Sequence, residues 1–246
     1  MTAIDVRSLV VRRGDATILD SVSFAAGAGE FIGVIGRNGA GKSTLLRALA
    51  GLEPHAAGDV LLDAVPVASL KPRDRARRIA FLPQMRELHW AATAESVVAL
   101  GRFAWGSPYR LGAPDRAAVD RAVAATDLEA FRGRIAQTLS GGEQARMHLA
   151  RALAAETPTL IADEPTAALD LRHALAILRL LREKTEAGGL VVAALHDIDL
   201  AQRFCSRLVV LDRGRIAADG PAHAGLTPDV ISSVFGVSAD DVRRAD

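Results

Sequence analysis

The sequence has a single cysteine, Cys205, among its 246 residues. One cysteine excludes an internal disulfide framework and a cysteine-rich metal site, so we expect Cys205 to be a small core residue. The N-terminus lacks a basic region followed by an apolar run, which is the pattern of a secretion signal. The longest apolar runs, such as 190–195, are much shorter than the roughly 20 residues that cross a bilayer. We therefore expect a cytoplasmic protein whose role at a membrane depends on a partner.

An excess of charge of one sign is also absent. The chain has 30 lysines and arginines against 29 aspartates and glutamates, which gives a formal net charge of +1. This balance carries no bulk electrostatic signal for nucleic acid, and we expect no nucleic-acid partner. The composition is 50% hydrophobic and 24% charged, which is ordinary for a globular protein. A chain of this length can bury a large core, and we expect one domain over residues 1–246.

Apolar segments typical of strands alternate with helical patterns along most of the chain. The segments that follow this alternation are 31–35, 79–82, 159–162 and 190–195. Alternating strands and helices predict an α/β fold with a mainly parallel sheet and helices on both faces. Residues 3–25 instead predict two strands around the turn Gly14-Asp15. Residues 93–135 contain two helical stretches and no clear strand, which predicts an inserted helical subdomain.

A glycine-rich loop follows the predicted strand at 31–35. Its sequence, GRNGAGKST, fits the pattern G-x-x-x-x-G-K-[ST] and precedes a predicted helix. The glycines let backbone N–H groups face a phosphate, and the helix N-terminus adds its positive dipole end. Lys42 would contact the β- and γ-phosphates, Ser43 would ligate magnesium, and Thr44 would add a phosphate contact. The predicted nucleotide-binding residues of this loop are Gly36, Arg37, Asn38, Gly39, Ala40, Gly41, Lys42, Ser43 and Thr44.

Two acidic residues end a second apolar strand, in the segment TLIADEP at 159–165. Asp163 would contact magnesium, through water, and Glu164 would orient and deprotonate the attacking water. Strands also commonly end in acidic residues at the surface. The segment indicates a catalytic site only because a predicted phosphate-binding loop precedes it in the chain. Together the two segments indicate a P-loop ATPase or GTPase. They do not indicate which process the nucleotide hydrolysis powers.

The segment LSGGEQ at 139–144 predicts a second anion-binding turn. Ser140, Gly141 and Gly142 precede a helix that we expect to start near Glu143, so a hydroxyl, backbone amides and a helix N-terminus come together. Ser140 and Glu143 also fit a capping box, and both interpretations can hold at once. Because one ATP does not need two separate phosphate-binding turns, two subunits that each supply one turn to the other's nucleotide are a simple explanation. We therefore predict a homodimer with ATP at its interface.

At this point the sequence resembles the ABC ATPase family over nearly its whole length. GRNGAGKST resembles the Walker A motif, LSGGEQ the family signature, LIADE the Walker B motif and Ala168-Leu169-Asp170 the D-loop. The resemblance implies a P-loop NTPase core with an N-terminal antiparallel β subdomain. It also implies an inserted α-helical subdomain at about 85–155, which carries the signature.

The resemblance implies further site residues. Gln84 resembles the Q-loop glutamine, which would ligate magnesium or the attacking water, and His196 resembles the switch histidine, which would bond the γ-phosphate. Asp170 would lie at the dimer contact, although an N-cap for the following helix also explains it. One departure is Arg13, which stands near the position where the family usually stacks an aromatic residue on adenine. A guanidinium can stack on a base, whereas a solvated arginine is the plainer interpretation.

Two segments resemble the importer subfamily that serves ferric siderophores, haem and cobalamin. They are TAESVVALGR at 93–102 and LDLRHALAILRLL at 169–181. The resemblance implies a polytopic membrane permease as partner, docked by a short helix in a groove beside Gln84, and indirectly a substrate-binding protein. It places the chain peripherally, on the cytoplasmic face of the inner membrane. The cargo would never touch this chain.

Other functions fit parts of the same pattern. An ATPase of a multi-chain ABC exporter and a non-transport ABC ATPase share all the motifs, whereas a P-loop kinase or GTPase lacks LSGGEQ. The arginines at 73–78 would add permease or lipid contacts, or simply form a solvated basic face.

Overall fold

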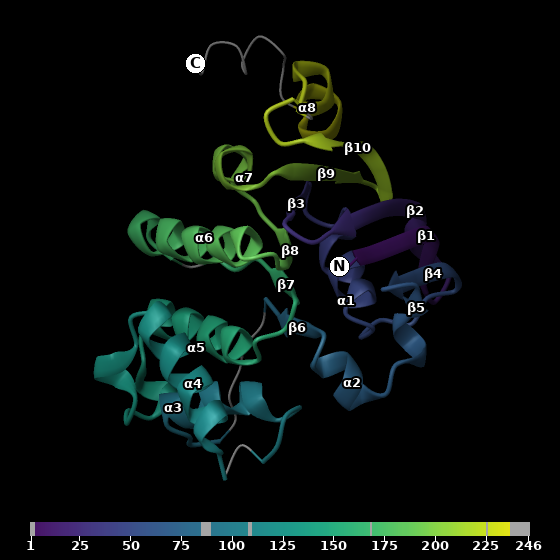
Figure 1. Cartoon of the computed structure of the whole chain (residues 1–246). Helices are drawn as coiled ribbons and strands as arrows, with labels where there is room; N and C mark the ends of the chain where they lie inside the picture. Colours follow the sequence, from purple (N-terminus) through teal and green to yellow (C-terminus); the bar gives the residue numbers. More distant parts are fainter. Residues whose placement is uncertain (1–2, 85–89, 108–109, 168, 225, 237–246) are drawn as a thin grey trace.

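Six strands form the central sheet, in the order β10-β9-β3-β8-β7-β6 (Figure 1). Their bounds are β3 Phe31–Gly36, β6 Ile79–Leu82, β7 Thr159–Asp163, β8 Leu190–Ala194, β9 Arg207–Asp212 and β10 Arg215–Pro221. The computed structural model describes residues 3–84, 90–107, 110–167, 169–224 and 226–236. All neighbouring strands are parallel except β9 and β10. Every residue of β3, β7 and β8 is buried, which explains their nearly continuous apolar sequences and confirms the predicted parallel sheet.

A second, antiparallel sheet has the order β2-β1-β4-β5. Its strands are β1 Ala3–Arg13, β2 Ala16–Gly27, β4 Ala57–Leu62 and β5 Val65–Pro66. The predicted turn between β1 and β2 is present, with Gly14 in the left-handed region at a φ of 57°. The register shifts between Val6 and Leu9, where Ser8 has a φ of 44°, and this irregularity keeps the apolar residues on both sides of it facing one core. The antiparallel N-terminal sheet is therefore as predicted, except that β5 was not foreseen.

Helix α1 (Lys42–Leu49) packs between the two sheets, and its apolar residues share one core with both (Figure 1). The opposite face of the central sheet is covered by α5 (Gly141–Ala154), α6 (Leu171–Glu186) and α7 (Ile198–Phe204), which form a second core. The remaining helices of this part are α2 Pro72–Ala76 and α8 Pro228–Phe235. Cys205 is buried in the second core, as expected, and burial raises the pKa of its thiol to about 12.

Three helices form a separate core below the central sheet in Figure 1. They are α3 Ala94–Ala99, α4 Ala113–Ala125 and α5 Gly141–Ala154. Short 3₁₀ turns connect them, at Leu100–Arg102, Glu129–Phe131 and Ala136–Thr138, and another, Val67–Ser69, precedes α2. Helix α5 begins at Gly141, slightly before the expected start near Glu143. Ser140 is its N-cap, so the two glycines already lie in the first turn.

Candidate active site

The loop between β3 and α1 depends on its glycines. Gly36 has a φ of 150°, and a Cβ there would lie 2.2 Å from the carbonyl oxygen of Leu211. Gly41 has a φ of 102°, and its Cβ would lie 2.8 Å from Cδ2 of Leu19. Both the conformation and the lack of space therefore require glycine at these positions. The loop that results leads directly into the N-terminus of α1, whose first-turn N–H groups have no partner within the helix.

Lys42 lies beneath this loop and is only 6% exposed. Its Nζ donates hydrogen bonds to the carbonyl oxygens of Gly36, at 2.8 Å, and of Arg37, at 3.1 Å. Burial lowers the pKa of the Lys42 ammonium, and the carboxylates of Glu164 and Asp163 oppose that change. The ammonium group is thus fixed at the point where the loop and the acidic end of β7 meet.

A cavity of about 610 Å³ opens over the loop. Its lining residues come from the first hairpin, the loop, and the ends of β6, β7 and β8: Arg13, Ile18, Asn38, Gly39, Gly41, Lys42, Ser43, Thr44, Gln84, Glu164 and His196. This volume lies within the range of roughly 300–1,000 Å³ that is usual for small-molecule sites. Because parallel strands end at the same edge of the sheet, side chains from far apart in the sequence converge here. Gly36, Arg37 and Ala40, which were also predicted to bind nucleotide, are not among the lining residues.

Glu164 lies at the centre of the acidic end of the site. Its backbone has a φ of 51°, unusual for a residue with a side chain, and its carboxylate is 13% exposed. Oε2 accepts a hydrogen bond of 2.7 Å from Nε2 of Gln84, and Oε1 is hydrogen-bonded to Nε2 of His196. The two side chains expected to serve the γ-phosphate region thus both contact the expected general base. Asp163, the last residue of β7, is 4% exposed and is not among the residues that line the cavity.

The cavity also has a feature that the sequence did not predict. Arg13 donates two hydrogen bonds to Oε1 of Glu53, at 3.0 and 3.1 Å, and one to Oε2, at 3.0 Å. Arg47 of α1 also donates to Oε2 of Glu53, at 3.0 Å. The carboxylate of Glu53 is only 9% exposed, whereas the Arg13 side chain is 55% exposed, so Arg13 is anchored to Glu53 and still faces solvent. No motif links Glu53 to Arg13, because the two lie 40 positions apart.

The signature segment lies outside this cavity. At the start of α5, the backbone N–H of Glu143 donates to Oγ of Ser140 at 3.3 Å, and that of Ser140 donates to Oε2 of Glu143 at 2.8 Å. This is the predicted capping box, and the hydrogen bond from Ser140 lowers the pKa of the Glu143 carboxyl. A Cβ at Gly141 would meet no atom within 4 Å, so that face of the turn is open. Within one copy, Ser140–Glu143 and the loop over Lys42 therefore form two separate sites.

Asp170 caps α6, as the alternative interpretation predicted. Its Oδ1 accepts a hydrogen bond of 2.9 Å from the backbone N–H of His173, and both carboxylate oxygens lie within 2.9 Å of Nδ1 of His173. These contacts lower the pKa of the Asp170 carboxyl. Ala168, which belongs to the predicted D-loop, lies outside the described residues.

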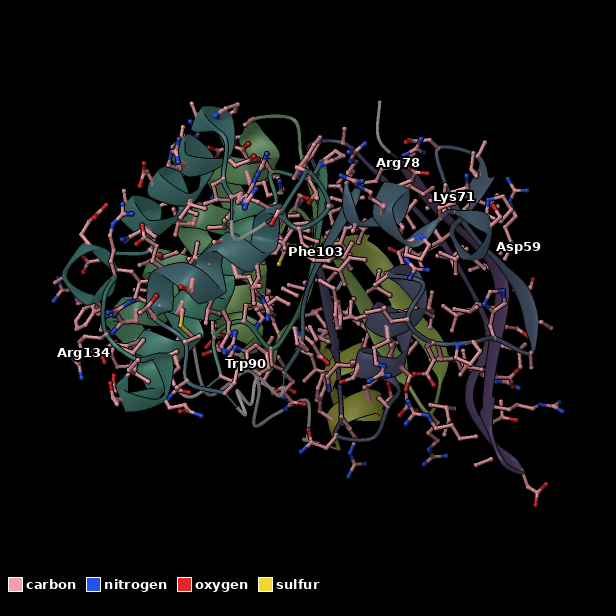
Figure 2. The ribbon with its side chains drawn as sticks, turned by 90° about the horizontal axis from the view of Figure 1, so that it is seen from below. Asp59, Lys71, Arg78, Trp90, Phe103 and Arg134 are labelled. Atoms are coloured by element: carbon pink, nitrogen blue, oxygen red, sulfur yellow. The ribbon has the colours of Figure 1, made fainter. Side chains whose placement is uncertain are left out.

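A second cavity, of about 750 Å³ and mostly apolar, lies between α2 and the segment after α3. Its lining includes Pro72, Arg73, Ala76, Phe103 and Ala104. Arg73 and Arg77 both donate to the carbonyl oxygen of Ala104, at 2.8 and 2.9 Å. Phe103 is 69% exposed, and Figure 2 shows it near the middle of the lower face. The groove is therefore tied to α2 and presents a large apolar side chain to solvent.

Comparisons with known proteins agree with this geometry. A family model described as ABC transporter matches residues 19–167. Hemin import ATP-binding protein HmuV of Nocardia farcinica is 49% identical over 93% of this chain and 81% of its own length. Cobalamin import ATP-binding protein BtuD of Halobacterium salinarum is 42% identical over 94% of this chain and 58% of its own length.

Solved structures have the same fold. An ATP-binding subunit of an ABC transporter superposes with a TM-score of 0.81 at 26% identity, covering 98% of both chains. A dimeric ATP-binding cassette in a post-hydrolysis state, bound to ADP and Pi, gives a TM-score of 0.80 at 28% identity, covering 89% of this chain and 98% of that one. Across the part of the chain that the structure describes, no helix has the length and apolar character needed to cross a membrane.

Proposed function

This chain belongs to the ABC transporter family, and we propose that it is the ATP-hydrolysing subunit that powers a separate membrane permease. The observation that carries the proposal is the single cavity in which the loop over Lys42 meets Gln84, Glu164 and His196. Phosphates would lie on Gly36–Thr44, where backbone N–H groups, the helix N-terminus and Lys42 supply positive charge. The first test is whether the protein hydrolyses ATP and whether substitution of Lys42 or Glu164 lowers the rate.

Magnesium fits the oxygen donors of this site. The hydroxyl of Ser43, the amide oxygen of Gln84 and, through water, the carboxylate of Asp163 are the hard ligands that Mg²⁺ prefers. When bound, the ion would neutralise charge on the β- and γ-phosphates. Glu164 would act as general base on the attacking water, and His196 would hold the γ-phosphate. Because Gln84 and His196 contact Glu164 in this structure, nucleotide binding would exchange those contacts for phosphate and magnesium.

We propose that two copies close around two ATP molecules. Ser140–Glu143 of one copy would then complete the site over Lys42 of the other, since a Cβ at Gly141 would meet no atom within 4 Å and the turn has room for a phosphate. Asp170 would lie near the contact between the copies. The dimeric cassettes among the similar structures support this arrangement. Crosslinking of a Ser140→Cys variant to a cysteine placed at Asn38 should require ATP, and crosslinking that ignores ATP would contradict it.

We propose that residues at about 85–155 form the helical subdomain that meets the permease, with the docked permease helix in the apolar groove at Phe103. The chain would sit peripherally on the cytoplasmic face of the cell membrane. Replacing Phe103 by glutamate should abolish co-purification of the permease from detergent extracts while leaving ATP binding unchanged, because Phe103 lies outside the nucleotide cavity. Val65→Glu, at an apolar residue on β5 that is 37% exposed, is the control and should retain the permease.

The names of the relatives support import of haem, another iron chelate or cobalamin, with an indirect substrate-binding protein. The cargo would be handled by the permease, so the described residues need no site for it. Reconstituted with its permease, the protein should drive ATP-dependent uptake of haem or cobalamin into vesicles. ATP-dependent export of the cargo, in place of import, would favour a multi-chain exporter.

Arg13 is the proposed contact for the nucleotide base, because it lines the same cavity as Lys42, which would contact the phosphates. A guanidinium stacked on a base at an exposed site contributes about 0.5–1 kcal/mol, so Arg13→Ala should raise the KM for ATP about two- to fivefold. The affinity for inorganic tripolyphosphate, which has no base, should not change. Arg12→Ala, at an exposed neighbour, is the control. An equal loss for tripolyphosphate would assign Arg13 to the phosphates.

A further inference from the structure

Another cavity, of about 500 Å³, lies between the end of α1, β4 and α2. It is separate from the nucleotide cavity and from the groove at Phe103. Its residues are Ala48, Gly51, Leu52, Glu53, Pro54, His55, Val60, Val67, Ala68 and Arg75. The volume lies within the roughly 300–1,000 Å³ typical of small-molecule sites, which combine an apolar lining with a few polar groups.

Arg75 is the cationic side chain that lines this cavity. It is half-buried, and within the described ranges its side chain makes no hydrogen bond or ion pair. A Cβ on Gly51 would lie 2.8 Å from Nη1 of Arg75 and 3.1 Å from its Cδ. The glycine that ends α1 therefore makes the room in which this guanidinium lies. A half-buried cation with no counter-charge is costly, and an anionic ligand would relieve that cost.

The carboxylate that lines the same cavity does not neutralise Arg75. Glu53 already binds the guanidinium groups of Arg13 and Arg47, and these three residues together carry one net positive charge. Asp74 precedes Arg75 in the chain but does not line the cavity. His55 does line it and supplies a further hydrogen-bonding group. Because the carboxylate of Glu53 is bonded to two other arginines, Arg75 is left as the lining cation without a carboxylate partner among the described residues.

The remaining walls are apolar. Val67 and Val60 are buried there, whereas Leu52 is 46% exposed. We propose that this cavity binds a small organic anion with an apolar body, its carboxylate paired with the guanidinium of Arg75 and its body against Leu52 and Val67. A guanidinium matches a carboxylate with two parallel hydrogen bonds, which favours this head group. The inference does not depend on the proposed function, because it concerns no residue of the nucleotide loop.

Titration calorimetry with octanoate tests the site on the full chain without nucleotide. Octanoate should bind with saturation and a stoichiometry of one. Octanol, which lacks the charge, and acetate, which lacks the apolar body, should bind more weakly. Arg75→Gln should weaken octanoate binding about ten- to a hundredfold, the range for a lost charge-assisted contact. Arg78→Gln is the matched control, because Arg78 follows α2 in the chain and does not line the cavity. This variant should bind octanoate as tightly as the parent does.

A second variant fills the space without altering charge. Ala68→Leu should also weaken octanoate binding, and circular dichroism should show the same thermal unfolding for each variant as for the parent. Octanoate binding that is unsaturable, or that Arg75→Gln leaves unchanged, would overturn the proposal. Equal affinity for octanoate and octanol would do the same, because the guanidinium would then have no role.

Discussion

Replacing Glu164 by glutamine should lower ATP turnover by about 10² to 10⁴, the usual effect of losing a general base. Glutamine has nearly the same shape, and its amide can keep both contacts of the carboxylate. Its oxygen can accept from Nε2 of Gln84, as Oε2 does now at 2.7 Å, and its NH₂ can donate to Nε2 of His196. The substitution therefore removes the basic oxygen while preserving the geometry. Steady-state phosphate release measures the turnover, and ATP binding should survive.

The same variant should accumulate as a closed, ATP-loaded dimer, because in the proposed cycle hydrolysis would reopen the dimer. Size-exclusion chromatography with and without ATP measures this shift. Glu183→Gln, at an exposed position on α6, controls for the loss of one negative charge and should hydrolyse ATP normally. Normal turnover by Glu164→Gln would remove Glu164 from the proposed role, and the strained backbone at this residue would need another explanation.

Contiguous motifs made much of the site predictable. The conformation of the loop GRNGAGKST is determined by local sequence: the spacing of its glycines, the buried strand before it and the helix after it. The predicted positions of Glu164 and His196 at strand ends also follow from one rule, that parallel strands end at a common edge. The structure accordingly brings Lys42, Gln84, Glu164 and His196 to one cavity.

Contacts that depend on tertiary packing were not predictable. Glu53 has no periodic or motif signal, yet its carboxylate pairs with Arg13, whose side chain is still 55% exposed, as expected of a solvated arginine. The expected start of α5 was slightly late for a local reason. Glycine is a poor helix former, so the helix was expected to start near Glu143, although the capping box predicted for Ser140 and Glu143 places Gly141 and Gly142 in the first turn. Strand β5 has two residues, too short for an alternating pattern.

Replacing Lys42 by alanine should weaken ATP binding about ten- to a hundredfold, since each charge-assisted hydrogen bond contributes roughly 1.5–3 kcal/mol. The ammonium now donates to the carbonyls of Gly36 and Arg37, so the loop has its cation in place before ATP arrives. In the ATP complex the same group would turn to the β- and γ-phosphates. Fluorescence titration with a labelled ATP measures the affinity. Lys71→Ala, at an exposed lysine of similar chemistry, is the control and should bind normally.

Weaker ATP binding by Lys42→Ala has two possible causes: loss of the ammonium charge at the phosphates, or loss of the two hydrogen bonds that Lys42 donates to the loop. The pH dependence of the ATP affinity distinguishes them. Burial lowers the pKa of Lys42 from the ordinary 10.5, so the parent loses this charge at a lower pH than an exposed lysine does. ATP affinity of the parent should therefore fall as the pH rises toward that lowered pKa, because the neutral amine cannot attract phosphate. The variant has no such group, and this alkaline decline should be absent from it. If both proteins lose affinity in parallel, Lys42 supplies only structure to the loop, and the phosphates are held by backbone N–H groups and the helix N-terminus alone.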